Sequence, residues 1–407
     1  MKSISKLRPV SGLAVLIFAA ALAPRPALSF YAMVDCNLGG SIQNQLNAGA
    51  TFIEVNGVCT EDISLQNDGT TILGQPPLSG DKIIGNVFIG GVQKVNINGM
   101  EIEGSTNIFD VGSAHFYQTR LDGATTLANG ATGNFNQTTF TGPGNVIVAN
   151  SSSATIGFSS IQNKDGDLAV NTGSFLQLND THISDLFGAF FVTTGSTASV
   201  FNATIEDTDN GMQVLRGSTL LVGNSTIGPA NVDDASASCN PVCVGDNSEA
   251  RFNDTSISGT NNDAGIGGAV SIYRQSSVRI RGNSSVTNNG SQPAVAAFHN
   301  SSVRQDKGSS PPADIVGGIT ALGSYVDFRN FRGVGDIYGD LNSVLRLRGS
   351  DPGNTSVVTG NITLNRDSAL DLGSPAPVVN GDIHCIDKQS AASGTAGGIG
   401  KRKCKSF

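Results

Sequence analysis

Tryptophan is absent from this sequence of 407 residues, and tyrosine and histidine occur only five and four times. Without Trp and with so few Tyr, the chain offers little material for an aromatic platform on which sugars could stack. The four histidines are scattered, and none lies beside a Ser or Cys in the setting of a catalytic triad: His115, His182, His299 and His384. Acidic residues outnumber basic ones, and the formal net charge is −8. An acidic charge spread along the chain argues against nucleic acid or an anionic membrane as the main partner.

Long apolar runs are also lacking after the first 29 residues. Three basic residues precede an apolar run at 13–23, and small residues at 27 and 29 precede a cut before Phe30. The pattern predicts a cleaved signal peptide over 1–29, because about ten apolar residues fall short of the roughly 20 needed to span a membrane. Its removal takes away four basic residues and no acidic one, which leaves the mature chain at −12. We therefore expect a secreted or periplasmic protein without a membrane span.

What the sequence does contain is a repeat of 22 residues. Each copy opens on Gly-Ser, and Asn and then Ile follow at nearly constant offsets: Gly173, Gly195 and Gly217, then Asn179, Asn202 and Asn224, then Ile183, Ile205 and Ile227. Every copy holds three short β-favouring runs separated by Asn, Gly and Asp, which is the pattern of strands and bends. Three strands per turn at a fixed period predict the coil of a parallel β-helix, whose apolar face is buried by stacking neighbours.

The predicted coils extend over most of the chain. Units at 116–121, 135–140 and 252–257 match the repeat, and looser ones continue to Leu370. We predict an all-β, single-stranded parallel β-helix (a solenoid) over 30–372, followed by a loosely ordered tail over 373–407.

The first part of the solenoid, 30–60, is predicted to be a cap. Ser41 is a candidate N-cap for a short helix in which Ile42 and Leu46 share one face. A cap is needed because the terminal coil of a stack leaves its core open.

All six cysteines lie in the exported part of the chain, which suits an oxidising compartment. Their spacing favours three local disulfides: Cys36–Cys59, Cys239–Cys243 and Cys385–Cys404. The alternative of a metal site is weaker, because no His partners lie near Cys239 and Cys243.

The recurring Asn-x-Thr/Ser tripeptides have two interpretations. They are acceptor motifs for glycosylation. Most of them also fall at one bend of the repeat, where Asn tolerates the left-handed conformation and its amide can bond to the next coil. We favour the structural interpretation.

Together, the Asn at the second bend, the three strands per coil and the cysteine-tied helical cap resemble the right-handed parallel β-helix proteins of the pectate-lyase-like superfamily. The resemblance covers most of 36–372 and implies a right-handed coil. It does not choose an activity, because that superfamily includes polysaccharide lyases, glycoside hydrolases, epimerases, phage tailspikes and non-catalytic surface proteins. Asp233-Asp234 and Arg279-Ile-Arg281 are similar to polygalacturonase motifs, but the Gly-His motif between them is missing.

The resemblance implies a substrate groove outside the strand that follows the longest bend. In this chain that bend is acidic in consecutive coils: Asp165, Asp167, Asp185, Glu206, Asp207, Asp209, Asp233 and Asp234. Crowded carboxylates raise one another's pKa or recruit a hard cation, and we consider Asp165, Asp167 and Asp185 as calcium ligands. The alternative is that Asp is simply a favourable bend residue.

Arg216, Arg274 and His299 are expected on the opposite edge of the same strand, with Phe191, Gln213 and Tyr273 facing outward between the edges. Such a groove could hold a glycan. A lyase would need a cation or Arg and a base, and a hydrolase would need two carboxylates. The best catalytic candidates are Asp207, Asp209, Asp233, Asp234, Arg216 and Arg274, with Phe191, Gln213, Tyr273 and His299 as substrate-binding residues.

Two functions follow from these observations. The first is a non-catalytic exported β-helix that binds or decorates a polysaccharide or cell-surface glycan. The alternative is a polysaccharide lyase or glycoside hydrolase acting on an acidic polysaccharide through the acidic edge. No cofactor is required for the first, and calcium is the cation that the second could use. The 228–246 insertion is longer than neighbouring bends, and such loops often carry function.

Overall fold

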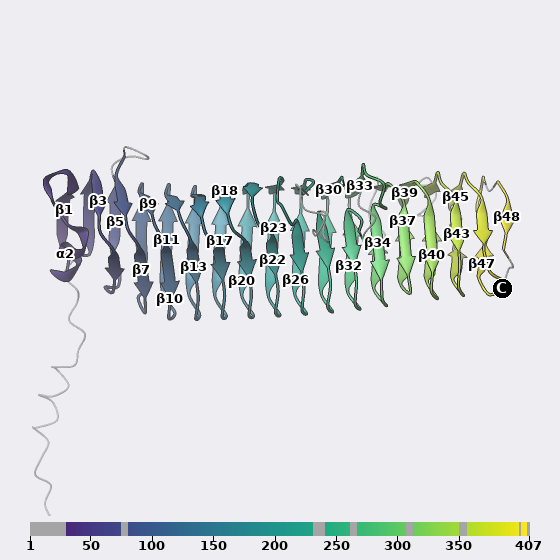
Figure 1. Ribbon diagram of the computed structural model, residues 1–407, viewed down its shortest axis with the longest axis horizontal. Coiled ribbons are helices and arrows are strands. Elements are labelled where there is room, and N and C mark those ends of the chain that lie inside the picture. Colours follow the sequence, from purple (N-terminus) through teal and green to yellow (C-terminus); the bar gives the residue numbers. More distant parts are fainter. Residues whose placement is uncertain are drawn as a thin grey trace, which may run out of the picture.

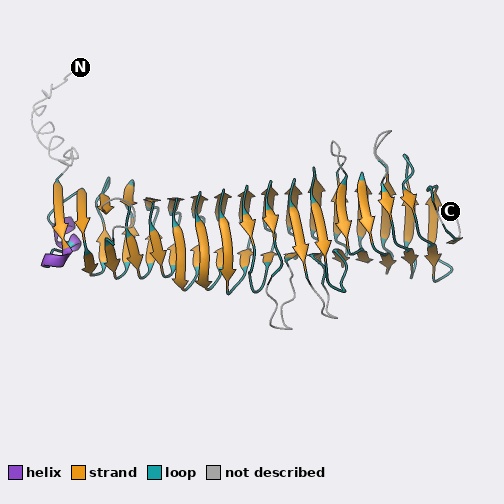
Figure 2. Cartoon of the chain, turned by 90° about the horizontal axis from the view of Figure 1, so that it is seen from above, coloured by secondary structure: helices purple, strands orange, loops and turns teal. Residues whose placement is uncertain are grey.

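The computed structural model describes residues 30–74, 80–230, 241–260, 267–306, 312–349, 356–398 and 400–404. The chain is an all-β parallel solenoid in which three sheets run the length of a rod (Figures 1 and 2). Within the described residues the sheets contain 17, 15 and 16 strands, which we name sheets A, B and C in the order in which each coil visits them. At ~4.8 Å per strand, sheet A spans about 75 Å.

Sheet A contains β1 (Tyr31–Asp35), β2 (Phe52–Asn56), β5 (Thr71–Gly74), β8 (Val95–Asn98), β11 (Ser113–Tyr117), β14 (Thr132–Asn136), β17 (Ser153–Gly157), β20 (Phe175–Asn179), β23 (Thr197–Phe201), β26 (Thr219–Gly223), β29 (Glu249–Asn253), β32 (Ser277–Arg281), β35 (Ser302–Gln305), β38 (Tyr325–Arg329), β41 (Val344–Arg348), β44 (Ala369–Leu372) and β47 (Ala391–Gly394). Sheet B contains β3 (Val58–Thr60), β6 (Lys82–Ile84), β9 (Glu101–Glu103), β12 (Arg120–Asp122), β15 (Thr139–Pro143), β18 (Ser160–Asp165), β21 (His182–Leu186), β24 (Thr204–Ile205), β27 (Thr226–Ile227), β30 (Ser256–Gly259), β33 (Ser285–Asn288), β36 (Ala313–Val316), β39 (Phe331–Val334), β42 (Val357–Val358) and β45 (Val378–Val379). Sheet C contains β4 (Ile63–Leu65), β7 (Val87–Gly90), β10 (Thr106–Phe109), β13 (Thr125–Leu127), β16 (Val146–Val148), β19 (Leu168–Val170), β22 (Phe190–Val192), β25 (Met212–Val214), β28 (Val242–Val244), β31 (Val270–Ile272), β34 (Val295–Phe298), β37 (Ile319–Leu322), β40 (Ile337–Asp340), β43 (Ile362–Leu364), β46 (Ile383–Cys385) and β48 (Arg402–Lys403).

The core consists of columns of like side chains, one residue from each coil. The predicted isoleucine column is confirmed, because the isoleucines of five consecutive sheet B strands pair in direct register and are buried: Ile161, Ile183, Ile205, Ile227 and Ile257. Sheet C supplies a second buried column: Val170, Val192, Val214, Val244 and Ile272. Each fully buried side chain of this size contributes ~1.5–3 kcal/mol, so stacking stabilises every coil.

A single residue with positive φ makes the bend from sheet A to sheet B. It is Gln137 (φ 52°), Phe158 (51°), Asp180 (48°) and Asn202 (52°) in four consecutive coils. The asparagines of the repeat do not all lie at this bend. Asn179 ends β20 and pairs with Phe201, one residue before Asn202. The expected asparagine column is therefore a mixed column in which only some members are Asn.

Two consecutive residues with positive φ make the bend from sheet C to sheet A, as at Thr194 (57°) and Gly195 (69°). A buried serine follows in successive coils. The Ser174 N–H donates to Ser196 Oγ at 3.2 Å, and the Ser196 N–H donates to Ser218 Oγ at 3.2 Å. The Gly-Ser pairs of the sequence repeat are thus vertical stacks that satisfy buried backbone groups.

The N-terminal end is closed as predicted. Helix α2 (Ile42–Asn47) follows a 3-10 turn, η1 (Cys36–Leu38), and buries Ile42 and Leu46 against the first coil (Figure 2). The Ser41 side chain accepts from the Asn44 N–H. The Glu61 carboxylate accepts from the Ser41 hydroxyl at 2.7 Å and the Ile42 N–H at 2.6 Å, where a negative charge suits a helix N-terminus.

Two of the predicted disulfides, Cys36–Cys59 and Cys385–Cys404, are present, and they fasten the two ends of the rod. The third includes Cys239, which lies outside the described residues. Two disulfides indicate an oxidising compartment.

Strand stacking continues beyond residue 372 through β45, β46, β47 and β48. The Arg402 guanidinium donates to the carbonyls of Ala392 and Gly394, which lie on the terminal strand of sheet A. This contact covers part of an otherwise open sheet edge.

Candidate functional site

Of the acidic residues singled out in the sequence, those that the structure describes lie at or next to the bend from sheet B to sheet C. Asp185 (φ 50°) and Asp207 (51°) follow Asn163 (49°) in a left-handed column. The following residues, Lys164, Leu186 and Thr208, are in register and buried. Asp185 and Asp207 therefore occupy positions where a short polar side chain is compatible with the left-handed backbone conformation. This supports the alternative interpretation, in which these Asp residues are present because they favour the bend.

The three residues considered for calcium differ in role. Asp167 Oδ1 accepts a hydrogen bond from the Ala189 N–H at 3.0 Å, whereas Asp165 is exposed at the end of β18. Within the described residues, no three His, Cys, Asp or Glu side chains gather in a group suited to a metal ion. Calcium binding stays a prediction.

Arg216, Arg274 and His299 lie on the opposite edge of sheet C, in the left-handed column of the bend to sheet A. Backbone hydrogen bonds place Asp246 between the two arginines in the stack. Arg274 Nη1 lies 3.0 Å from Asp246 Oδ1, and its guanidinium carbon lies 5.8 Å from the centroid of the Tyr273 ring. Burial raises the pKa of the Tyr273 hydroxyl, and the Asp246 carboxylate adds to the shift. Arg274 is thus already paired.

The outward face of sheet C between these two edges, where the substrate-binding residues were predicted, is only partly open. Phe191 and Gln213 pair in register and are half-buried. The outward positions of the next three strands are covered: Cys243 and Ser271 are 1% exposed and Ala296 is 0% exposed. Gly268 lies over Ala296, since a Cβ there would lie 3.3 Å from the Ala296 Cβ. A long groove on sheet C is therefore interrupted at β28–β34.

Asp233 and Asp234, together with most of the 228–246 insertion, lie outside the described residues. Asp207 and Asp209 precede β25, and Arg216 follows it. The strand thus separates the described carboxylates from the arginines, with Gln213 between them on the outward face.

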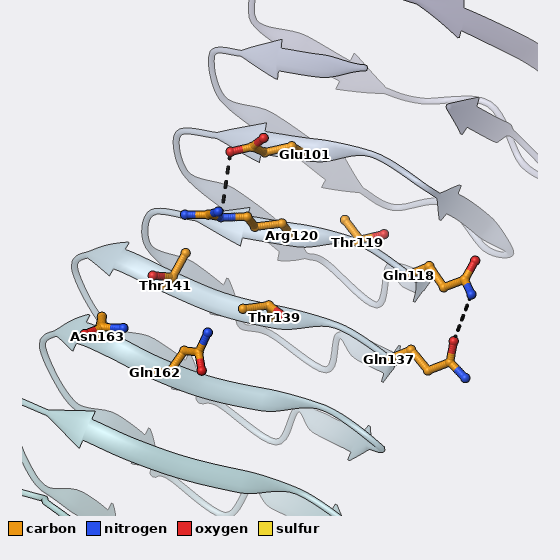
Figure 3. Close-up of a pocket in the computed structure, with 9 residues that line it drawn as sticks. All are labelled: Glu101, Gln118, Thr119, Arg120, Gln137, Thr139, Thr141, Gln162 and Asn163. Carbon is orange, nitrogen blue, oxygen red and sulfur yellow. Dashed lines mark hydrogen bonds and ion pairs between the residues drawn. The ribbon is translucent and has the colours of Figure 1, made fainter. Parts of the chain in front are cut away.

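An open groove of about 580 Å³ lies instead on the outer face of sheet B (Figure 3). It crosses β9, β12, β15 and β18, and nine residues line it: Glu101, Gln118, Thr119, Arg120, Gln137, Thr139, Thr141, Gln162 and Asn163. Four are amides and three are hydroxyls, so its lining is mainly neutral and polar. Gln118 Nε2 donates to Gln137 Oε1 at 3.0 Å along the side of the groove next to sheet A.

Charges in the groove are confined to one end. Glu101 lies 3.7 Å from Arg120 and 3.3 Å from Lys82. Beneath the other end, the side chain of Lys164 is fully buried, and its Nζ donates to the carbonyls of Thr141 at 3.0 Å and Gly123. The carbonyl of a groove residue is thereby held by a buried ammonium.

Exposed aromatic rings lie along the A–B bend beside this groove. Tyr117 is 43% exposed and immediately precedes Gln118. Phe158 is 64% exposed and follows Gln137 in the left-handed column, where the Gln137 N–H donates to the Gly157 carbonyl at 3.1 Å. Phenylalanine is uncommon in the left-handed conformation and is strained there. Because the ring of Phe158 is largely exposed, its burial contributes little to stability.

Sequence reasoning did not identify this groove. Its polar residues are spread over four coils, and each alone is an ordinary strand or bend residue. One signal was available, which is Phe158 at a position where other coils have Gln, Asp or Asn.

No protein-family model, no curated protein and no solved structure matches the chain. The fold class is therefore given by the strand pairings themselves. In the part of the chain that the structure describes, no helix is long and apolar enough to cross a membrane.

Proposed function

We propose that the protein is an exported, non-catalytic β-solenoid that binds a neutral glycan through the groove on sheet B. We also propose the finer assignments: a right-handed coil of the pectate-lyase-like kind, made with a signal peptide and released into the periplasm or secreted. The observation that carries the proposal is the open groove lined by amides and hydroxyls next to exposed aromatic rings.

The chemistry of the groove suits sugar hydroxyls. Gln137, Gln162 and Asn163 each offer a donor and an acceptor, and Thr139 adds a hydroxyl. Aromatic faces can pack against the apolar faces of sugar rings. Phe158 keeps an exposed ring at the cost of a left-handed backbone, and such strain supports a functional role.

Binding is favoured over catalysis by the arrangement of charge. Glu101 is the single carboxylate among the nine lining residues, and it lies within reach of Lys82 and Arg120. A glycoside hydrolase uses two carboxylates at about 5–5.5 Å or 6.5–9.5 Å. The groove lining does not offer such a pair.

Affinity electrophoresis against a β-glucan, a xylan and a mannan tests the proposal. We expect retention by at least one of them. Phe158→Asn and the double variant Gln137→Ala/Gln162→Ala should each weaken it about tenfold, which corresponds to ~1.4 kcal/mol. Gln177→Ala, an amide on the outer face of sheet A, is the matched control and should bind like the wild type.

Phe158→Asn also separates function from stability. Asn accepts the left-handed conformation more readily, so this variant should unfold at a higher urea concentration while binding more weakly. Absence of binding to every neutral glycan, or binding unchanged in both groove variants, would contradict the proposal. Release of unsaturated or reducing ends from polygalacturonate or alginate, with or without Ca²⁺, would establish the enzyme alternative instead.

A further inference from the structure

The outer face of sheet A changes character at β29. Its strands β14, β17, β20, β23 and β26 contain no charged residue. The sheet A strands β29, β32, β35, β38, β41 and β44 contain seven arginines: Arg251, Arg279, Arg281, Arg304, Arg329, Arg346 and Arg348. The acids of these strands and the residue after β35 are four: Glu249, Asp306, Asp327 and Asp371. The face carries a net charge of +3 on a chain whose formal charge is −8.

The central arginines form a line along the long axis of the rod. Arg251 pairs in register with Arg279, and Arg279 with Arg304, so three guanidiniums follow one another at about one strand spacing, ~4.8 Å. Like charges directly opposite each other on paired strands destabilise a sheet. Fold stability therefore does not explain this row.

The carboxylates beneath the row leave the arginines incompletely paired. The Arg251 guanidinium donates to both oxygens of Glu249, at 2.9 and 3.0 Å, and Arg279 lies 3.5 Å from the same carboxylate, so two arginines share one acid. Arg304 Nη2 lies 3.9 Å from Asp327 Oδ2. Asp327 is 2% exposed and also accepts from Arg348 at 2.6 Å. In contrast, the Arg251 and Arg304 side chains are 44% and 47% exposed, so the guanidiniums lie at the surface above the acids.

We propose that this face, centred on the row Arg251, Arg279 and Arg304, binds an extended carboxylated polysaccharide along the axis of the solenoid. An extended uronate chain adds one carboxylate per sugar over about the length that the solenoid adds one arginine per coil. The Arg guanidinium pairs with a carboxylate in a two-point geometry, which gives orientation as well as charge. The face lies on a different sheet from the sheet B groove and does not depend on it.

The other polyanions fit this face less well. Single-stranded nucleic acid is bound on stacked aromatic side chains. Among the outward positions of the sheet A strands β29, β32, β35, β38, β41 and β44, the aromatic residue is Tyr325 alone. An anionic membrane surface favours basic residues spread around apolar anchors. The arginines here follow a line.

The test measures binding to polygalacturonate and to its methyl ester, which has the same backbone without the charge. We expect the wild type to bind the acid form at least tenfold more tightly, and less tightly as NaCl rises from about 50 to about 300 mM. The triple variant Arg251→Gln/Arg279→Gln/Arg304→Gln should lose at least tenfold. Because that variant leaves Glu249 without its arginines, the single Arg304→Gln variant, expected to lose about threefold, provides the check on folding.

The matched control is Lys94→Gln/Arg332→Gln/Lys401→Gln, which removes the same charge from positions outside the row and should bind like the wild type. Equal loss in both triple variants would overturn the proposal, since the effect would then follow net charge. So would equal binding of the methyl ester, or tighter binding of duplex DNA or phosphatidylglycerol vesicles than of polygalacturonate. Neutral-glycan binding in the sheet B groove should be unchanged in the arginine variants, so the two proposals fail separately.

Discussion

At the scale of the residue, position in a column decides what a side chain does. The sequence predicts a catalytic role for Asp207 and calcium binding for Asp185, but their left-handed backbone places both in a column with Asn163. Arg274 likewise lies in a bend column with His299, and its guanidinium forms an ion pair with Asp246. An unusual residue in such a column is therefore more informative than a charged one, and Phe158 is the clearest case.

Lys164 is the most unusual residue of the interior. It takes the place that Leu186 occupies in the next coil, with a fully buried side chain whose ammonium donates to backbone carbonyls. Burial lowers the pKa of this ammonium to about 8, although the Asp122 carboxylate acts in the opposite direction. The unfolded chain keeps a lysine pKa near 10.5.

Lys164 should therefore make stability depend on alkaline pH. Between pH 8 and 10.5 the unfolded state binds the proton that the folded state has lost, so the free energy of unfolding rises with pH in this window. We expect a rise of about 1–3 kcal/mol from this group. Urea unfolding of the wild type and of Lys164→Met at pH 7, 8.5 and 10 measures it. Subtracting the variant's profile removes the other lysines and tyrosines, and identical profiles would show that Lys164 does not titrate there.

At the scale of the element, the bend from sheet B to sheet C limits how closely coils can stack. Gly85, Gly104 and Gly123 follow β6, β9 and β12 with φ between 149° and 152°. A Cβ on Gly104 would lie 2.3 Å from the Gly85 carbonyl oxygen, and one on Gly123 would lie 2.3 Å from that of Gly104. Each glycine thus meets the backbone of the preceding coil.

Gly104→Ala should destabilise the protein by at least about 3 kcal/mol, because the methyl group meets a carbonyl that cannot move without shifting a whole coil. Gly69→Ala is the matched control. It also has a positive φ, 76°, but nothing lies within 4 Å of its added Cβ, so it should cost only about 1 kcal/mol. Urea midpoints at constant m-value give both quantities. Equal costs for the two variants would mean that backbone conformation, rather than the close approach, dominates.

The elements also show how far the sequence could predict the structure. The isoleucine, valine and Gly-Ser columns were readable because a stack repeats the same residue in the same environment. The register of Asn179 was not readable in the same way. Asn179 precedes the left-handed residue of its bend, whereas Asn202 occupies that position, and a difference of one residue hardly changes the repeat.

The open site was harder to predict than the fold. The covering of Ala296 by Gly268 depends on a loop with no periodic signal. The groove on sheet B depends on side chains such as Gln118 and Asn163 that belong to different coils and come together only when those coils are aligned.

At the scale of the whole molecule, the rod separates two kinds of surface. The N-terminal half carries a mainly neutral groove on sheet B, and the C-terminal half carries the arginine row on sheet A. An overall acidic chain therefore presents a locally basic face, and the argument from net charge against nucleic acid or an anionic membrane as the main partner holds only for the average charge of the surface. Because a solenoid contacts only its neighbours along the axis, the two surfaces can change independently.

The same one-dimensional contact pattern predicts how the rod fails when its cap is opened. Leu46 is 4% exposed on α2 and packs over the first coil. Leu46→Asp buries an unpaired carboxylate there, so the cap should detach and the strands nearest to it should lose their covering. Hydrogen exchange should then lose protection over 31–65, while the strands from β20 onward stay protected as in the wild type. Asn44→Asp, with the same charge on the exposed side of α2, should change neither region. Uniform loss of protection along the rod would show instead that the coils unfold as one cooperative unit, and the ends would then have no separate stability to lose.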